Sequence, residues 1–141
     1  MNDQQAHALL VEQLIDLAAE VHGMTRELVE RLGLGESEAR LLWLIDPDAE
    51  PLPLRQVASR MHCDPSNVTL IGAKLEGRGL VRRAAHSRDG RVRTLVLTAA
   101  GRKMRERLLA GACARSPFGA LDGREQRQLS QLLAKVLLPE L

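Results

Sequence analysis

Apolar side chains recur at helical spacing through the first part of the chain. One stripe repeats at intervals of four, three and four residues, and a second stripe lies beside it. The first stripe consists of Leu10, Leu14, Leu17 and Val21, and the second of Val11, Ile15 and Ala18. The pattern predicts a helix over residues 3–32. Because a helix that is apolar over so wide an arc needs cover on more than one side, we expect a partner subunit to pack against it.

A second, shorter helix follows. Gly33 and Gly35 interrupt the first helical pattern. The apolar residues of the second helix are Leu34, Leu41, Leu42 and Ile45. The Asp46-Pro47-Asp48 turn and the nearby Pro51 and Pro53 end it.

A helix-turn-helix pattern lies in the middle of the chain. Residues 54–61 have the spacing of a helix of about two turns, and residues 62–64 make a tight turn. Pro65 stands where the next helix has its first residue, with Asp64 as N-cap, and this helix ends within residues 77–79. Two short helices joined by a three-residue turn form a helix-turn-helix.

The second helix of this pair has an apolar face and a mainly polar face. The inward residues are Val68, Ile71, Gly72 and Leu75. The outward residues are Ser66, Asn67, Leu70, Ala73 and Lys74, with Thr69 at the edge. The amide of Asn67 suits adenine, and Thr69 or Leu70 suits a thymine methyl group. Lys74 can reach guanine or phosphate, and Ser66 suits a phosphate oxygen near the helix N-terminus. A merely solvated helix face is the alternative.

Alternating residues then predict a β-hairpin rich in arginine. Strands are expected over residues 80–85 and 92–97, with Asp89-Gly90 as the turn signal. Residues 78–93 contain six arginines and a single acid, and we expect this density to repel itself unless an anion lies nearby. The candidate DNA contacts are Arg88, Asp89, Arg91 and Arg93.

Asp89 and Arg91 lie two residues apart at the hairpin tip. The carboxylate can hold the guanidinium in one orientation and let it enter a minor groove beside the helix-filled major groove. An ion pair that merely stabilises the turn is the alternative, and both roles can hold at once.

Two further helices complete the chain. Thr98 is expected to cap a linking helix over residues 99–115. Its buried side holds Met104, Leu108 and Leu109. Asp122 and Glu125 fit a capping box at the start of the last helix. The apolar side of that helix carries Leu129, Leu132, Leu133 and Val136.

The net charge of +2 hides an uneven distribution. Residues 1–50 hold eleven acidic and three basic side chains, whereas residues 51–93 hold nine basic and three acidic ones. Since a polyanion meets a local field rather than an average, the middle third is the candidate nucleic-acid face. Trp43 and Phe118 are the only large aromatic side chains, which leaves no stacking platform for single strands and favours duplex DNA.

Several other functions lack their characteristic residues. The longest apolar run, residues 41–45, is far shorter than the roughly 20 residues of a membrane span, so we expect a cytoplasmic protein without membrane contact. Cys63 and Cys113 lack metal-ligand spacing, so no metal site is expected, and Cys63 is interpreted as a packing residue. The sequence contains no Gly-x-Ser-x-Gly motif, no glycine-rich phosphate loop beyond the weak Gly33-Leu34-Gly35 and no grouping of His and carboxylates with metal spacing, so catalysis is not expected.

Taken together, these patterns resemble the MarR family of winged helix-turn-helix transcriptional regulators. The family's wing motif, Asp-x-Arg followed by Leu-Thr and Gly, is matched by Asp89, Arg91, Leu97, Thr98 and Gly101. The stretch 64–81 is similar to the recognition-helix stretch that ends in Leu-Glu-x-x-Gly-Leu-Val. The sequence departs from the family at Leu70, where Arg is common, at Gly72, where a larger aliphatic residue is common, and at His62, where Gly often turns the chain.

The resemblance implies a ligand-responsive repressor that binds a pseudo-palindromic operator as a homodimer. Because the first and last helices pair in the family, the implied dimer interface is Leu10, Leu14, Leu17, Val21, Leu129, Leu132, Leu133 and Val136. Many members release DNA when a small aromatic or lipophilic effector enters a cleft. The effector candidates are His22, Met24, Arg26, Trp43 and Met104, for which an ordinary packing or surface role is the alternative. No other cofactor is expected.

The expected fold class is therefore mainly α with a small β-hairpin wing. A winged helix-turn-helix over residues 36–98 is combined with dimerisation helices over residues 3–32 and 122–138 and the linking helix, in a single domain over residues 1–141. Two other functions remain open. A protein-interaction module would have lost DNA binding, which Leu70 in place of Arg favours, and an architectural protein would bind DNA without sequence preference.

Overall fold

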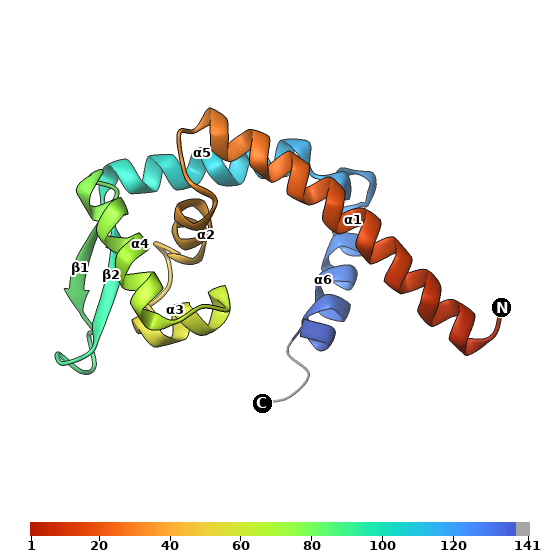
Figure 1. Cartoon of the computed structure of the whole chain (residues 1–141), viewed down its shortest axis with the longest axis horizontal. Coiled ribbons are helices and arrows are strands. Elements are labelled where there is room, and N and C mark those ends of the chain that lie inside the picture. Colours follow the sequence, from red (N-terminus) through yellow and green to blue (C-terminus); the bar gives the residue numbers. More distant parts are fainter. Residues whose placement is uncertain (138–141) are drawn as a thin grey trace. The chain divides into compact units, whose positions relative to one another are not determined.

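The computed structural model describes residues 1–137 as helices and one β-hairpin (Figure 1). The helices are α1 (Asp3–Arg31), α2 (Glu36–Leu44), α3 (Leu54–Met61), α4 (Pro65–Gly77), α5 (Ala99–Arg115) and α6 (Gly123–Leu137), with a short 3-10 helix, η1 (Pro117–Ala120). The strands β1 (Val81–Ala85) and β2 (Arg93–Leu97) pair antiparallel, with Val81 opposite Leu97. The predicted fold class, mainly α with a small hairpin, is confirmed for the described residues.

The two strands are shorter than predicted. They were expected from Leu80 and Val92, and each begins one residue later. The amide of Leu80 donates instead to the carbonyl of Leu75 at 3.0 Å, and the amide of Val92 donates to the carbonyl of Asp89 at 3.0 Å. The end of α4 and the wing turn therefore use these backbone groups. The predicted last helix extends to residue 138, which lies outside the described residues.

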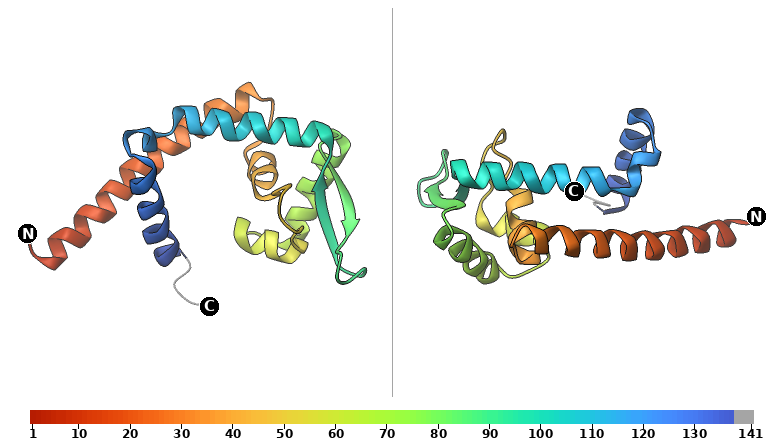
Figure 2. Two further views of the ribbon diagram at one scale, coloured as in Figure 1. Left: turned by 180° about the vertical axis from the view of Figure 1, so that it is seen from behind. Right: turned by 90° about the horizontal axis from the view of Figure 1, so that it is seen from above.

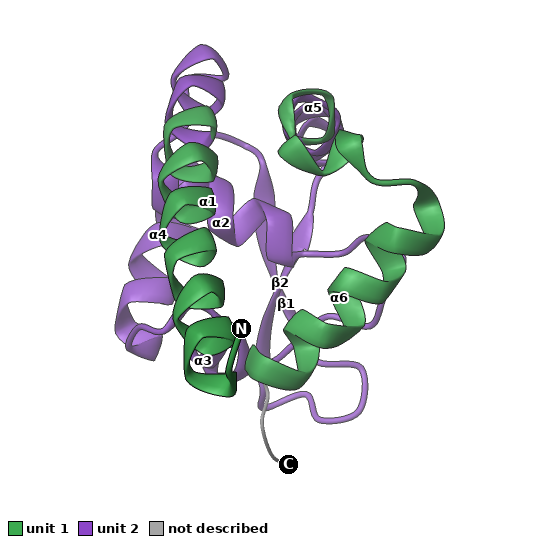
Figure 3. Cartoon of the chain, turned by 90° about the vertical axis from the view of Figure 1, so that its right-hand side faces the viewer, with its two compact units in different colours: residues 1–24, 113–141 green, residues 25–112 purple. Residues whose placement is uncertain are grey.

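The chain divides into two compact units (Figure 3). Unit 1 comprises residues 1–24 and the described part of residues 113–141, and unit 2 comprises residues 25–112. The long helices α1 and α5 each contribute residues to both units. Unit 2 contains the helix-turn-helix and the hairpin, so all the candidate DNA contacts belong to one unit.

Unit 2 has a continuous apolar core. Its largest fully buried apolar side chains are Leu41, Leu42, Val68, Leu75 and Val81. Leu28 and Val29 of α1 and Leu108 of α5 belong to the same core, and Cys63 packs partly buried against it. Because burial of one Val or Leu side chain stabilises a fold by roughly 1.5–3 kcal/mol, this core holds α4 firmly against α2 and the hairpin.

Gly72 allows α4 to approach the hairpin closely. A Cβ atom at this position would lie 3.0 Å from Cδ1 of Leu95 on β2, closer than ordinary van der Waals contact. The side chain of Leu95 therefore occupies the space that a larger aliphatic residue at position 72 would need. Figure 2 shows the hairpin beside α4 within unit 2.

The turn between α3 and α4 depends on a left-handed residue. His62 has a φ of 54°, and it is the only non-glycine residue with positive φ among residues 1–137. Asp64 holds the predicted N-cap position with an extended backbone, but its side chain makes no capping hydrogen bond, in contrast to the expectation. The amide of Asn67, a usual partner of such a cap, donates to the backbone carbonyl of Asp64 at 3.0 Å instead.

Thr98 caps α5 as predicted. Its hydroxyl accepts a hydrogen bond of 3.0 Å from the amide of Gly101, and its own amide donates to the carbonyl of Leu80 at 3.1 Å. A Cβ atom at Gly101 would overlap the carbonyl oxygen of Leu80. The glycine therefore allows the first turn of α5 to lie directly on the residue that precedes β1.

Within unit 1, the start of α6 forms the predicted capping box. The amide of Glu125 donates to Oδ1 of Asp122 at 2.8 Å, and the amide of Asp122 donates to Oε2 of Glu125 at 3.1 Å. The side-chain amide of Gln126 donates to the carbonyls of Phe118 and Leu121 at 3.0 and 3.1 Å, which joins α6 to η1.

Unit 1 also exposes much of its apolar surface. The exposed members of the predicted dimer interface are Leu10, Leu14, Leu132, Leu133 and Val136, with exposed fractions of 65%, 57%, 57%, 37% and 71%. Leu17, Val21 and Leu129 are half-buried. The two helices that carry these residues thus present apolar side chains to solvent in the single chain.

Candidate nucleic-acid interface

The outward face of α4 is arranged as the sequence predicts. Ser66, Asn67, Thr69, Leu70 and Lys74 are all exposed. Val68 and Leu75, on the opposite face, are fully buried in the core, so the helix cannot rotate to change which residues face outward. The hydroxyl of Thr69 donates to the carbonyl of Pro65 at 3.1 Å, a bond within the helix. Leu70 is 57% exposed, which places a large apolar side chain in the middle of this face.

The wing turn lies between β1 and β2. The amide of His86 donates to the carbonyl of Val92 at 2.8 Å, which closes the turn. Oδ1 of Asp89 accepts a hydrogen bond of 3.0 Å from the amide of Arg91 and lies 3.7 Å from Nε of the same residue. The side chain of Arg91 is 96% exposed. Asp89 thus orders the turn and contacts the guanidinium, an arrangement compatible with both the structural and the DNA-binding interpretation.

Glu50 was not among the predicted site residues, yet it contacts the wing. Its Oε1 accepts a hydrogen bond of 2.7 Å from the hydroxyl of Ser87 and lies 3.6 Å from Nε of Arg88 and from Nε2 of His86. The hydrogen bond from Ser87, followed by the charge of Arg88, holds the pKa of Glu50 below its ordinary value of 4.5. The segment between α2 and α3 therefore fixes one side of the wing turn.

The expected excess of positive charge is partly balanced by distant carboxylates. Nη1 of Arg78 donates to the carbonyl of Gly33 at 2.9 Å and to Oε2 of Glu38 at 3.3 Å. Nε of Arg83 lies 3.8 Å from Oε1 of Glu76. Glutamates from outside residues 78–93 approach three of the six cations, so carboxylates of the chain itself relieve part of the repulsion among these arginines. Among the described residues, the side chain of Arg93 has no ion pair and remains available to phosphate.

The predicted effector residues fall in both units. His22 and Met24 belong to unit 1, whereas Arg26, Trp43 and Met104 belong to unit 2. Arg26 lies 3.9 Å from Glu36 in an exposed ion pair, and Met104 packs against the core.

Trp43 is also exposed, and its carbonyl accepts hydrogen bonds of 3.3 and 3.1 Å from Nε and Nη2 of Arg105. A shared effector cleft for these five residues stays a prediction.

The described residues show neither a membrane-spanning helix nor a metal-binding cluster. None of the described helices combines the length and apolar character needed to cross a membrane. No cluster of three or more His, Cys, Asp or Glu side chains with the geometry of a metal site occurs among residues 1–137.

The family model for MarR matches residues 34–92, from two residues before α2 to the end of the wing turn. This match covers the helix-turn-helix, β1 and the wing turn, and it ends before β2. Over these residues the chain is similar to the MarR family. Among curated proteins, it is 34% identical over 87 residues to the HTH-type transcriptional repressor MdtR of Bacillus subtilis (strain 168). That alignment covers 60% of this chain and 56% of the repressor, so it spans little more than half of the repressor's length.

Solved MarR-type structures share the fold over more of the chain. CouR from Rhodococcus jostii RHA1, solved with p-coumaroyl-CoA, has a TM-score of 0.79 and 27% identity, with 92% of each chain covered. A Mycobacterium tuberculosis MarR family protein in complex with salicylic acid has a TM-score of 0.64 and 25% identity, with 88% of this chain and 93% of that chain covered. These matches confirm the predicted winged helix-turn-helix architecture.

Proposed function

We propose that this chain is a MarR family regulator of transcription that binds double-stranded DNA in a sequence-specific manner. The observation that carries this proposal is the rigid, exposed face of α4 beside a hairpin tip that bears Arg91. Asn67 supplies paired hydrogen bonds to a base, and Thr69 and Leu70 supply apolar contacts. Ser66, Lys74, Arg88 and Arg93 supply phosphate contacts, with Arg91 held by Asp89 for the minor groove. Since the proposed partner is chromosomal DNA, we place the protein in the cytoplasm and assign it no catalytic role.

The regulator acts as a homodimer in this proposal. The exposed apolar residues of α1 and α6 support pairing with a second copy of this chain, because a soluble monomer rarely leaves so many large apolar side chains uncovered. Charge supports the same pairing: residues 3–24 carry Asp3, Glu12, Asp16 and Glu20 and no Lys or Arg, whereas α6 carries Arg124, Arg127 and Lys135. A twofold dimer places its two recognition helices in successive major grooves, about 10 base pairs apart.

A small aromatic effector controls DNA binding in this proposal. The support is that CouR was solved with p-coumaroyl-CoA and the Mycobacterium tuberculosis relative with salicylic acid. By analogy, His22, Met24, Arg26, Trp43 and Met104 are the candidate contacts, with His22 and Arg26 offering hydrogen bonds to a carboxylate or phenolate. We further propose repression as the mode of action, by analogy with the Bacillus subtilis repressor.

A protein-interaction module is the second candidate, because Leu70 is a large exposed apolar side chain on the face that would otherwise read bases. Selection of bound sequences from random duplexes separates the two functions. A regulator enriches one pseudo-palindromic sequence with half-sites about 10 base pairs apart, whereas an interaction module enriches none. An architectural protein also enriches none, but it binds many sites on each DNA molecule at low salt.

A further inference from the structure

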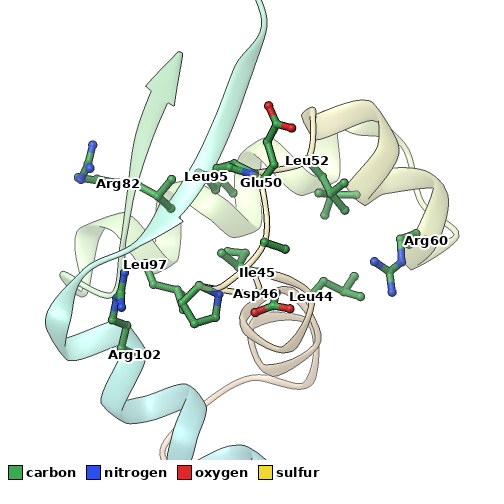
Figure 4. A pocket seen from close by; sticks show the side chains of 15 residues that line it. Leu44, Ile45, Asp46, Glu50, Leu52, Arg60, Arg82, Leu95, Leu97 and Arg102 are labelled. Carbon is green, nitrogen blue, oxygen red and sulfur yellow. The ribbon is translucent and has the colours of Figure 1, made fainter. Parts of the chain in front are cut away.

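A cavity of about 400 Å³ lies within unit 2, between β2 and the segment that joins α2 to α3 (Figure 4). Its apolar lining includes Leu44, Ile45, Leu52 and Leu97. This volume falls within the range of small-molecule sites, roughly 300–1,000 Å³. None of the predicted effector residues lines the cavity, so it is a different place in the fold.

Three arginines line the cavity: Arg60 of α3, Arg82 of β1 and Arg102 of α5. Figure 4 shows Arg82 and Arg102 on the side of β2 and α5, and Arg60 on the opposite side. Among the described residues, none of the three guanidinium groups has an ion pair. Three cationic side chains are therefore available at the edge of an apolar surface.

The two carboxylates that line the cavity already have partners. Oδ1 of Asp46 accepts a hydrogen bond of 2.9 Å from the amide of Asp48. Oε1 of Glu50 is engaged by Ser87 at 2.7 Å and by Arg88 at 3.6 Å. Because the acidic groups are engaged and the basic groups are not, the cavity favours an anionic ligand over a cationic one.

We propose that this cavity binds an amphipathic monoanion, a carboxylate carried on a compact apolar body. The carboxylate pairs with Arg82 and Arg102, and the apolar body lies against the leucine-rich lining. Guanidinium groups suit this role because they donate two parallel hydrogen bonds to one carboxylate.

Glu50 connects the cavity to the wing, since the same carboxylate lines the cavity and holds the wing turn. A bound anion places a second negative charge near Glu50, and the two like charges repel. The contact of Glu50 with Ser87 and Arg88 is then weakened, and the wing turn becomes less ordered in the free protein. Binding to DNA must order it, which costs conformational entropy. Binding of the anion thus lowers DNA affinity. This second step rests on the proposed DNA-binding function, whereas binding in the cavity does not.

Isothermal titration calorimetry of the full chain without DNA tests the cavity, with 2-naphthoate and its uncharged analogue 2-naphthamide as probes. We expect naphthoate to bind at least tenfold more tightly than the amide, and R82A and R102A each to weaken it about tenfold. Both arginines are exposed, so neither change disturbs the core. R55A, an exposed arginine of α3 that does not line the cavity, is the matched control and leaves affinity unchanged.

Isoleucine methyl NMR locates the bound probe. The chain has three isoleucines, and Ile45 lines the cavity whereas Ile15 and Ile71 do not. Naphthoate should shift the methyl signal of Ile45 and leave that of Ile71 in place. Equal affinities for acid and amide, no binding, unchanged affinity in R82A and R102A, or an unmoved Ile45 signal would each overturn the proposal.

Operator affinity measured with and without naphthoate tests the connection through Glu50. We expect at least a threefold loss of affinity in the wild type and a smaller loss in Glu50→Gln, which keeps the shape of the side chain and removes its charge. An unchanged affinity in the wild type would contradict the connection. If no duplex is bound at all, the proposed function fails, and the calorimetric and NMR results still decide the cavity.

Discussion

The hydroxyl of Thr98 donates a hydrogen bond of 2.6 Å to the carbonyl oxygen of Gly79. The hydroxyl oxygen of Thr98 also accepts a hydrogen bond from the amide of Gly101, so one side chain joins the segment after the recognition helix to the first turn of α5. Gly79 has a φ of 74°, a conformation that favours glycine. The Leu-Thr and Gly part of the wing motif therefore packs the end of α4 against the start of α5. The Asp-x-Arg part lies at the exposed tip of the hairpin.

Replacing Thr98 should destabilise the fold, because its hydroxyl joins Gly79 to the first turn of α5. We expect Thr98→Ala to lower the free energy of unfolding by about 1–3 kcal/mol, because it removes a helix cap and leaves the Gly79 carbonyl without its donor. Thr98→Ser keeps the hydroxyl and should lose less than half as much. Urea denaturation of both variants measures the difference. Equal stability of Thr98→Ala and the wild type would show that the hydroxyl contributes nothing.

The helix-turn-helix and the hairpin were predictable because their signals are local. Pro65 after Asp64, the helical apolar spacing and Asp89-Gly90 each act within a few residues. The long-range pairs of unit 2 could not be predicted: Glu50, which contacts the wing, lies 37 residues before Ser87, and Glu38, which contacts the end of α4, lies 40 residues before Arg78. Such pairs exist because packing brings distant segments together, and no spacing in the sequence indicates them.

The wing turn should lose one of its attachments in acid. Because the pKa of Glu50 is lowered in the folded protein, its contacts contribute stability above the unfolded value near 4.5, and this contribution is lost as pH falls through the lower, folded pKa. Glu50→Gln should therefore show faster amide hydrogen exchange at Ser87 and Arg88 than the wild type near neutral pH. The two proteins should converge as pH falls through the lowered, folded pKa of Glu50. A difference that persists undiminished in acid would contradict this role of the carboxylate.

The exposed apolar residues of α1 should be required for dimerisation. We expect Leu14→Asp to convert the dimer to a monomer at micromolar concentration, because it would bury an unpaired charge in the interface. Gln13→Glu, an exposed neighbour on the same helix, adds a negative charge outside the apolar stripes and is the matched control. Sedimentation equilibrium measures both variants. A dimer that tolerates Leu14→Asp would place the interface elsewhere.

Contacts made by α4 and by the wing should contribute differently to the salt dependence of DNA affinity. Asn67→Ala removes a base contact, so it should reduce the preference for one base step and leave the salt dependence unchanged. Selection from random duplexes with this variant should therefore return the wild-type sequence with one position blurred. Retention of full preference at every position would mean that Asn67 does not contact a base.

The dissociation constant of the selected duplex, measured over a range of salt concentrations for the wild type and Arg91→Ala, tests the central claim most directly. If the wing carries Arg91 to the phosphates and the minor groove, the variant binds every sequence more weakly, and the slope of log K against log salt falls in magnitude by about one. An affinity and a slope equal to those of the wild type would contradict the account.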